Sequence, residues 1–197
     1  MLIKTIEFDL LNLGCGNMIL PGCVNIDLLK PKNLENLMVV KTNFQFIQAE
    51  ALEFLQSTYL IKKFKKIFAF FFLEHLSPAD VSFLPFLLNQ SLELGGEFIA
   101  IVPDFDCIVN EYLNGLSLQA VSWDLLSDER TTWHYTLWNK AEVKRIFLSD
   151  GFELIEYRKG VAGRNTAAIF RLKKVSEIGT PMDLIREFLS VAEETMR

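Results

Sequence analysis

The N-terminal part of the sequence contains a glycine turn at the end of an apolar stretch, residues 10–16 with the sequence LLNLGCG. Glycine lets the backbone approach a ligand closely, and open α/β folds bind ligands at the carboxyl ends of their strands. The next apolar stretch, residues 24–27, ends at Asp27, whose carboxylate can accept hydrogen bonds from both hydroxyls of a ribose. Taken alone, the glycines are explained by an ordinary tight turn, and Asp27 is explained by a solvated strand end. Together, the two features predict a nucleoside-type ligand.

The spacing of these residues argues against a dinucleotide. The dinucleotide fingerprint has a third glycine and places its acid about 20 residues further on. Here Ile19 stands at the third-glycine position, and Asp27 follows Gly16 by 11 residues with Pro21 and Gly22 between them. No full crossover helix fits into that interval, so a pyrophosphate on a helix N-terminus is poorly supported. A nicotinamide-dependent oxidoreductase is therefore disfavoured.

Candidates for acid–base chemistry follow the predicted fourth and fifth strands. His75, next to Glu74, and His134 are the only histidines, and imidazole titrates near neutral pH. His75 is either an acid–base group or a structural contact at the next helix start. A structural role is favoured for His134, which lies among aromatic residues. Asp104 is the better polar candidate for an acceptor pocket, whereas Asp106 is predicted to be the N-cap of the next helix.

The cysteines do not indicate a nucleophile or a metal. Cys15 lies in the glycine turn without a thiolate-stabilising base nearby, and its small size at a close backbone approach explains it. Cys15, Cys23 and Cys107 match neither a disulfide framework nor a zinc site. The sequence therefore predicts a reducing compartment, the cytoplasm, and no metal site.

Composition limits the class of protein. The chain has 197 residues, half of them apolar, 17 of them Phe, and a formal charge of −5. These values exclude disorder and fit one well-cored domain over residues 1–197. The mild acidity predicts no nucleic-acid partner. No stretch approaches the roughly 20 apolar residues of a membrane span, so no membrane association is predicted.

Apolar and amphipathic stretches alternate along the chain, which predicts an α/β domain with a parallel sheet. Seven strands are predicted, at residues 8–13, 24–28, 44–48, 67–72, 97–102, 152–158 and 166–172. The last two strands flank a loop with Gly160 and Gly163, which suits an antiparallel hairpin at the sheet edge.

Helix signals lie between these strands. Predicted helices run from a cap at Ser77 to about Leu92 with a stop at Gly95-Gly96, from Cys107 to Leu113, from a cap at Asn139 to Gly151, and over 180–197. The apolar stripe of the last helix suits packing on the sheet or on a second subunit, so a homodimer stays open. Residues 116–138, which hold all three tryptophans, fit no regular element. They are predicted to be either a functional insertion or an aromatic cover over the sheet edge.

Five segments, taken in order over residues 10–172, resemble the class I S-adenosylmethionine-dependent methyltransferases, in their small single-domain branch. The resemblance rests on LNLGCGN with LPGCVNIDL, on QAEA at 48–51, on FLEHL at 72–76, on LGGEF at 94–98 and on VPDFD at 102–106. It implies a Rossmann-like, seven-stranded, mostly parallel sheet with helices on both faces and an antiparallel C-terminal hairpin. It also implies S-adenosyl-L-methionine as the cofactor.

The resemblance implies roles for individual residues. Gly14, Cys15 and Gly16 line the methionine end of the cofactor, Asp27 holds the ribose, Leu28 lies beside the adenine, and Glu50 faces the adenine amino group. The other implied cofactor contacts are Asn12, Ala51, Phe71 and Leu73. The implied catalytic candidates are His75, Glu74 and Asp104. The acceptor is expected to be a small or sugar-like molecule.

Two departures from the family pattern leave an alternative open. Asn12 stands where the family usually has an acid, and Phe68, Phe70 and Phe71 stand where it often has polar residues. A neutral amide and an apolar wall offer less to the cofactor's ammonium and methionine groups. The alternative is a methyltransferase-like protein that does not catalyse the reaction and serves as a binding partner.

Overall fold

The computed structural model describes residues 6–32, 34, 43–126, 133–162 and 165–179 of the chain. The elements, in chain order, are β1 (Leu10–Leu13), β2 (Val24–Asp27), β3 (Gln45–Gln48), α2 (Ala51–Thr58), β4 (Phe64–Phe70), the 3-10 helix η1 (Leu73–His75), α3 (Pro78–Ser91), β5 (Leu92–Pro103), α4 (Phe105–Leu113), α5 (Leu118–Leu126), α6 (Lys140–Phe147), the 3-10 helix η2 (Leu148–Asp150), β6 (Phe152–Ala162) and β7 (Asn165–Lys174). None of the described helices has both the length and the apolar character needed to span a bilayer.

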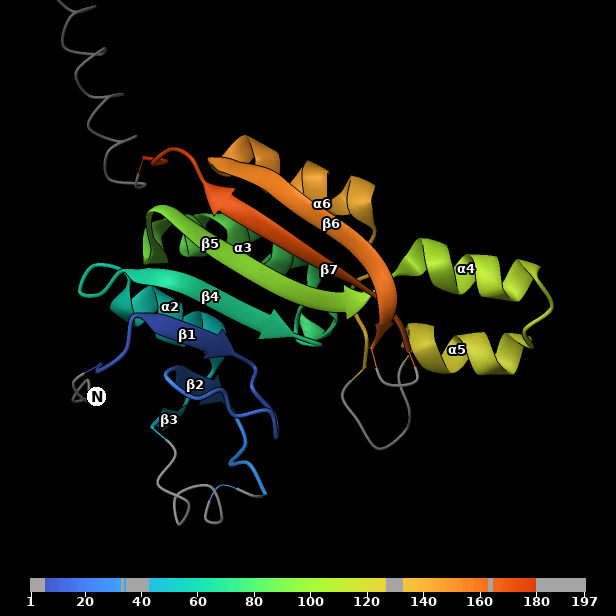
Figure 1. The fold of residues 1–197 in the computed structure, drawn as a ribbon, viewed down its shortest axis with the longest axis horizontal. Helices are drawn as coiled ribbons and strands as arrows, with labels where there is room; N and C mark the ends of the chain where they lie inside the picture. Colours follow the sequence, from blue (N-terminus) through green and yellow to red (C-terminus); the bar gives the residue numbers. More distant parts are fainter. Residues whose placement is uncertain (1–5, 33, 35–42, 127–132, 163–164, 180–197) are drawn as a thin grey trace, which may run out of the picture.

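The seven strands form one sheet in the order β3-β2-β1-β4-β5-β7-β6. Strands β1 to β5 pair in parallel, whereas β7 pairs antiparallel with both β5 and β6 (Figure 1). The predicted Rossmann-like, mostly parallel sheet with a C-terminal antiparallel hairpin is thus confirmed. Strand order reverses beside β1, because β2 lies on one side of it and β4 on the other. Such a reversal is where open α/β sheets place their ligands.

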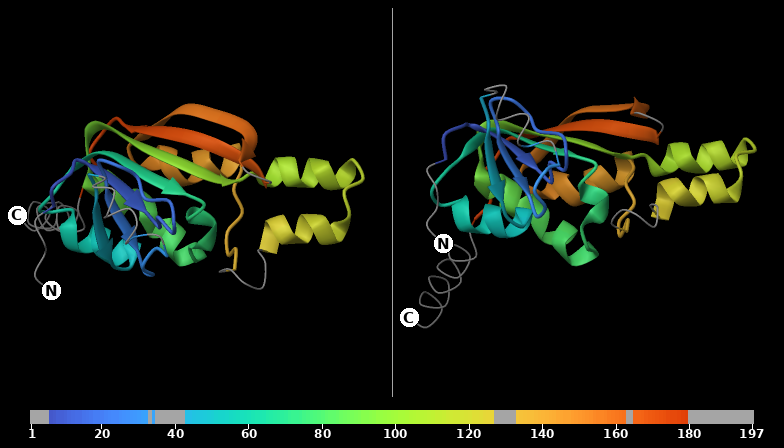
Figure 2. Two further views of the ribbon diagram at one scale, coloured as in Figure 1. Left: turned by 60° about the horizontal axis from the view of Figure 1, so that its bottom comes forward. Right: turned by 90° about the horizontal axis from the view of Figure 1, so that it is seen from below.

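Helices α2, α3 and α6 cover the same face of the sheet, and α3 contacts both of the others (Figure 2). Phe98, Ala100 and Val102 of β5 are buried in the core with these helices, while Ile99 and Ile101 between them are half-buried. On the opposite face, Phe68 and Phe70 of β4 are also half-buried, with ring centroids 5.8 Å apart. The connections that could cover this second face are 14–23, which is a loop, and 28–44, of which residues 33 and 35–42 lie outside the described part.

Local capping signals are confirmed at two helices. Ser77 accepts a hydrogen bond from Asp80 N at the start of α3, and Asn139 accepts one from Glu142 N at the start of α6. Gly151, with φ of 77°, ends the turn after α6 in the left-handed conformation. Side chains within three residues of the helix start make both caps, so both are readable from the sequence.

Other predicted boundaries are wrong. Residues 118–126 of the supposedly irregular segment 116–138 form α5, which packs against α4 to make a helical hairpin that projects beyond the sheet (Figure 1). Helix α2 carries no strong start signal and was not predicted. The predicted C-terminal helix, residues 180–197, lies outside the described residues.

The predicted end of α3 near Leu92 is confirmed, because α3 ends at Ser91. The predicted stop at Gly95-Gly96 is wrong, because β5 follows the helix at once. The glycines lie inside β5, where the register to β4 is irregular. The end of α3 is capped instead by Lys174 of β7, which is 0% exposed. Its ammonium donates to Asn89 O at 2.6 Å and to Leu92 O at 2.9 Å. Asn89 O is one of the last carbonyls of the helix, which have no partner within it, and Leu92 is the C-cap.

Replacing Lys174 with Met should destabilise the fold. Methionine replaces the aliphatic stem of Lys174 with an unbranched apolar chain but cannot donate a hydrogen bond. The Asn89 and Leu92 carbonyls are then unpaired, and each unpaired buried group lowers the free energy of unfolding by about 1–3 kcal/mol. We expect a loss of about 2–4 kcal/mol in the free energy of unfolding, measured by urea denaturation. Lys173→Met is the matched control, because Lys173 is exposed on the same strand. Equal stability of the two variants would contradict the capping role.

Candidate active site

The carboxyl ends of β1, β2, β4 and β5 lie at one edge of the sheet. Leu13 pairs with Ile26 of β2 and Ala69 of β4, and Phe70 pairs with Ile101 of β5. The loops after these strands therefore meet at this edge (Figure 1). They carry most of the predicted site residues: Gly14, Cys15, Gly16, Asp27, Leu28, Phe71, Leu73, Glu74, His75 and Asp104.

The glycine loop is fastened to Asp27. Gly16 N donates to one carboxylate oxygen of Asp27 at 2.7 Å, and Leu29 N donates to the other at 2.8 Å. Each carboxylate oxygen offers about two acceptor positions, so Asp27 can still accept hydrogen bonds from two hydroxyls. A Cβ at Gly16 would meet no atom within 4 Å, which leaves open space over this part of the loop.

The end of β4 packs closely on the same loop. Gly14 has φ of 58°, and a Cβ there would lie 2.1 Å from a ring carbon of Phe72. The neighbouring Phe71 has φ of 52°, a left-handed conformation that is unusual for a bulky side chain. Strained backbone of this kind clusters at functional sites. The Gly14–Phe72 contact and the Phe71 strain both lie at the edge where a ligand is expected.

Asn12 supports the loop from beneath. It is buried, and its amide nitrogen donates to Met18 O and to Asn25 Oδ1, both at 2.9 Å. Asn25 Oδ1 also accepts from Leu20 N at 2.8 Å. Both N–H groups of the Asn12 amide are thus used inside the protein. The amide therefore supports the loop, and its predicted contact with the cofactor stays a prediction.

The predicted adenine contacts lie where β2 and β3 end. Leu28 is exposed, and its carbonyl accepts a hydrogen bond from Gln48 Nε2 at 3.0 Å. Glu50 is the N-cap of α2, where its carboxylate accepts from Glu53 N at 2.7 Å. Ala51 is buried at the first position of that helix. Glu50 can still accept a further hydrogen bond, since one backbone amide does not saturate a carboxylate.

Cys15 has the environment of an inert thiol. Its side chain is 5% exposed, and burial, followed by the charge of Asp27, raises its pKa to about 12. A thiol with such a pKa is almost entirely protonated at neutral pH and is a poor nucleophile. The structure agrees with a packing role for Cys15.

The 3-10 helix η1 is covered by the segment that precedes α6. Tyr135 N and Thr136 N donate to Glu74 O at 2.7 and 3.2 Å. Thr136 Oγ1 donates to Leu73 O at 2.9 Å. Leu73 itself is fully buried, so it supports the site wall from inside. These bonds hold residues 133–138 across the end of β4.

The same bonds bring together two histidines that are far apart in the sequence. The His75 and His134 rings have centroids 5.0 Å apart in an edge-to-face arrangement. His75 Nδ1 lies 3.1 Å from Trp133 O. Because a carbonyl only accepts, Nδ1 donates its hydrogen to Trp133 O. The position of His134 beside His75 was not predicted, and no local pattern around either residue signals it.

Glu74 is buried next to this pair. Its side chain is 2% exposed, and Oε2 has no hydrogen-bond partner among the described residues. Burial raises the pKa of the Glu74 carboxyl to about 8. In this environment the carboxyl is largely protonated at neutral pH, and its role as a general base stays a prediction.

Asp104 contacts residues of both α4 and β6. The prediction that Asp106 caps the next helix is wrong. Asp104 is the N-cap of α4, where it accepts from Cys107 N at 2.8 Å. Tyr157 donates its hydroxyl to the same carboxylate, and Lys159 Nζ lies 3.2 Å from it. The cap lies two residues earlier than predicted because α4 begins directly after β5.

The electrostatics of Asp104 follow from these contacts. Burial raises its pKa, but the hydrogen bonds from Tyr157 and Cys107 outweigh this effect and bring the pKa below its usual value. Asp104 is 0% exposed. It therefore offers no surface to an acceptor, in contrast to its predicted place in the acceptor pocket. Tyr157 and Lys159 come from a distant strand, so the sequence gives no sign of their contacts with Asp104.

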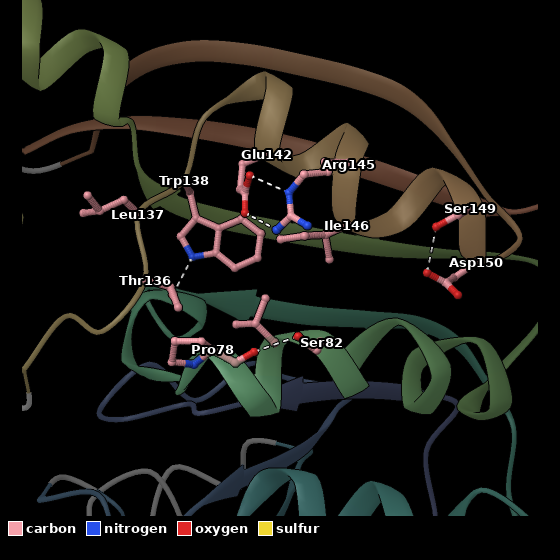
Figure 3. Close-up of a pocket in the computed structure, with 11 residues that line it drawn as sticks. Pro78, Ser82, Thr136, Leu137, Trp138, Glu142, Arg145, Ile146, Ser149 and Asp150 are labelled. Carbon is pink, nitrogen blue, oxygen red and sulfur yellow. Dashed lines mark hydrogen bonds and ion pairs between the residues drawn. The ribbon is translucent and has the colours of Figure 1, made fainter.

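A cavity of about 440 Å³ lies on the helix-covered face, between α3 and α6 (Figure 3). Trp138 and the ion pair of Glu142 with Arg145 line it, the latter joined at 2.9 Å. Its lining includes neither the glycine loop nor Asp27. The predicted ligand edge is therefore distinct from this cavity.

Solved structures of methyltransferases share the fold. The 1,6-didemethyltoxoflavin-N1-methyltransferase of Burkholderia thailandensis, with bound 1,6-didemethyltoxoflavin and S-adenosylhomocysteine, is 12% identical over 85% of this chain and 71% of that chain, with a TM-score of 0.61. The N-methyltransferase NodS of Bradyrhizobium japonicum is 13% identical over 85% of each chain, with a TM-score of 0.57.

A third similar structure is the magnesium protoporphyrin IX methyltransferase of Synechocystis with bound S-adenosylhomocysteine. It is 12% identical over 86% of this chain and 75% of that chain, with a TM-score of 0.57. No protein-family model and no curated protein sequence matches the chain. At these identities the likeness establishes the Rossmann-like methyltransferase fold.

Cys15 should resist alkylation in the native protein. At pH 8 a thiol with a pKa of about 12 is roughly 1 part in 10,000 thiolate, and its burial also blocks the reagent. We expect mass spectrometry to find Cys15 unmodified by iodoacetamide in native protein and fully modified after denaturation. Native labelling of Cys15 at the rate of an exposed thiol would show that it is an activated nucleophile.

Proposed function

We propose that this chain, which has the fold of the class I methyltransferases, moves a methyl group from S-adenosyl-L-methionine to a small-molecule acceptor. The observation that carries the proposal is the glycine loop, residues 14–16, fastened to Asp27 at the carboxyl ends of β1 and β2. Two neighbours of the same fold are solved with S-adenosylhomocysteine, and their names specify small-molecule substrates.

The residues at this edge fit the cofactor. The half-buried Asp27 has acceptor capacity for the two ribose hydroxyls, which matches its predicted role. Open space over Gly16 leaves room for a ligand against the backbone. Leu28 offers an exposed apolar side chain for the adenine, with Glu50 at the start of α2 beside it. We assign Asn12 and Leu73 the role of holding the residues that line the cofactor site in place.

The bound cofactor supplies a methyl group that its positively charged sulfur already activates. The protein then mainly has to bring the acceptor atom into line with the methyl group, and such positioning can account for about 7–11 kcal/mol of a barrier. Asp27 and the glycine loop fix the nucleoside end. The strained turn at Phe71 and the Phe72 ring on Gly14 set the shape of the wall beside it.

An acceptor that carries a proton has to lose it as the methyl group is transferred. We assign this part of the reaction to the cluster of Glu74, His75 and His134. The hydrogen bond from His75 Nδ1 to Trp133 O orients this ring at the edge. Asp104, predicted as a third catalytic residue, instead positions α4.

One observation favours the alternative of a non-catalytic partner protein. The Phe72 ring lies directly on Gly14, so an apolar group occupies part of the wall that the methionine end of the cofactor would face. Asn12 also brings no charge to this place. If the cofactor does not bind, the edge is left as a surface for another ligand.

Cofactor binding gives the deciding test. A ligand at about 100 times its Kd adds about 2.7 kcal/mol, which raises the Tm of a domain of this size by roughly 5–10 °C. We expect such a shift with S-adenosylmethionine or S-adenosylhomocysteine and none with NAD. The absence of a shift with all three ligands would reject the methyltransferase in favour of the partner protein.

Asp27→Ala tests the placement of the ribose. Because it removes the carboxylate that binds both the loop and the hydroxyls, the variant should lose the thermal shift with S-adenosylhomocysteine while still unfolding cooperatively. Glu93→Ala is the control, an exposed carboxylate near the start of β5. An unchanged Kd in Asp27→Ala, measured by calorimetry, would mean that the ribose lies elsewhere.

A further inference from the structure

We propose that Glu74, His75 and His134 form a binding site for a divalent first-row metal ion, best fitted by zinc, at the sheet edge beside the glycine loop. The sequence alone predicts no metal site, because the three proposed ligands lie on two segments that are far apart along the chain. Their juxtaposition appears only when residues 133–138 are hydrogen-bonded across η1.

The three side chains are close enough to share an ion. Each offers one ligand atom, a carboxylate oxygen or an imidazole nitrogen, and these atoms all lie within 4.8 Å of one another. Ligands of a tetrahedral zinc ion at about 2.1 Å are about 3.4 Å apart. Side-chain movements of about 1 Å are therefore enough to close the site around an ion.

The donor set is one that zinc prefers. Zinc takes imidazole nitrogens and carboxylate oxygens, and sites with three protein ligands keep a fourth position for water or substrate. Two histidines with one carboxylate are such a set. His75 and His134 are half-buried, whereas Glu74 is buried. The site is thus closed on the Glu74 side and accessible on the histidine side.

The ring of His75 makes a contact that is common among metal-binding histidines. Histidines that bind metals commonly donate their other ring N–H to a carbonyl or carboxylate, which fixes the tautomer. His75 Nδ1 makes this contact with Trp133 O at 3.1 Å. Trp133 directly precedes His134, so one short segment supplies both a ligand and the group that orients its neighbour.

Glu74 supplies a second, independent indication. Its Oε2 is buried and has no hydrogen-bond partner among the residues that the structure describes. Buried polar atoms in native proteins normally have a partner, and an unpaired buried carboxylate is costly. A bound cation would satisfy this oxygen and stabilise the charge. The unpartnered oxygen belongs to the same cluster as the two imidazoles, so an ion bound there would satisfy it.

The ion also has a chemical use at this edge, and this part of the inference rests on the proposed function. A metal ion lowers the pKa of a water or hydroxyl group that it binds. An acceptor hydroxyl bound at the fourth position would therefore lose its proton to solvent water more easily. Its oxygen would then attack the methyl group, and S-adenosylhomocysteine would leave. The cluster would then activate the acceptor through the ion, with His75 as a ligand.

Metal binding can be measured without cofactor or acceptor. Full-length protein is stripped with a chelator, dialysed and titrated with Zn²⁺ by calorimetry, with Co²⁺ absorption as a report of the coordination. We expect one ion per chain, and a Tm increase of about 5–10 °C at about 100 times the Kd. His134→Ala and Glu74→Gln should each weaken Zn²⁺ binding more than about 100-fold, since even outer partners of a metal site contribute about 10- to 100-fold.

Cys107→Ser is the matched control, because it removes the most accessible thiol and should leave Zn²⁺ binding unchanged. No saturable binding in the native chain, or equal binding in His134→Ala, would overturn the site. The readouts also separate the two proposals. His134→Ala should keep its thermal shift with S-adenosylhomocysteine, and Asp27→Ala should keep its Zn²⁺ binding.

Discussion

The connection between β1 and β2 is held in shape by side chains instead of by a helix. All of its residues, 14–23, are described, and they contain only turns. Asn25 Oδ1 receives hydrogen bonds from Asn12 Nδ2 and Leu20 N, while Asp27 receives one from Gly16 N. These bonds fix the glycine backbone against the ends of two strands. The rest of the edge, from the Phe72 ring on Gly14 to the histidine pair, is arranged around that fixed loop.

The parts of the structure that follow from local chemistry could be predicted. The caps of α3 and α6 depend on Ser77 and Asn139, each of which bonds to an amide three residues on. The glycine turn and Asp27 are likewise recognisable, because backbone geometry and a terminal acid are properties of short segments. The side chain that caps the end of α3 could not be predicted in this way, because it is Lys174, far along the chain.

The same distinction divides the site. The sequence predicts Asp106 as the cap of the next helix, but Asp104 caps α4, and Tyr157 and Lys159 from β6 contact its carboxylate. The meeting of His75 with His134 depends on hydrogen bonds between two segments, not on the residues around either. Burial of Glu74 has the same origin. When the neighbours of a side chain lie on other elements, its burial and its contacts cannot be predicted from the spacing of residues along the chain.

The position of β7 has a consequence for the order in which the protein can be completed during synthesis. Strand β7 lies between β5 and β6, yet β5 ends at Pro103 and β7 begins only at Asn165. While the intervening residues leave the ribosome, β5 is an edge strand with unpaired backbone groups, and the last carbonyls of α3 still await Lys174. The nascent domain is therefore open to unwanted strand pairing until nearly all of it has emerged.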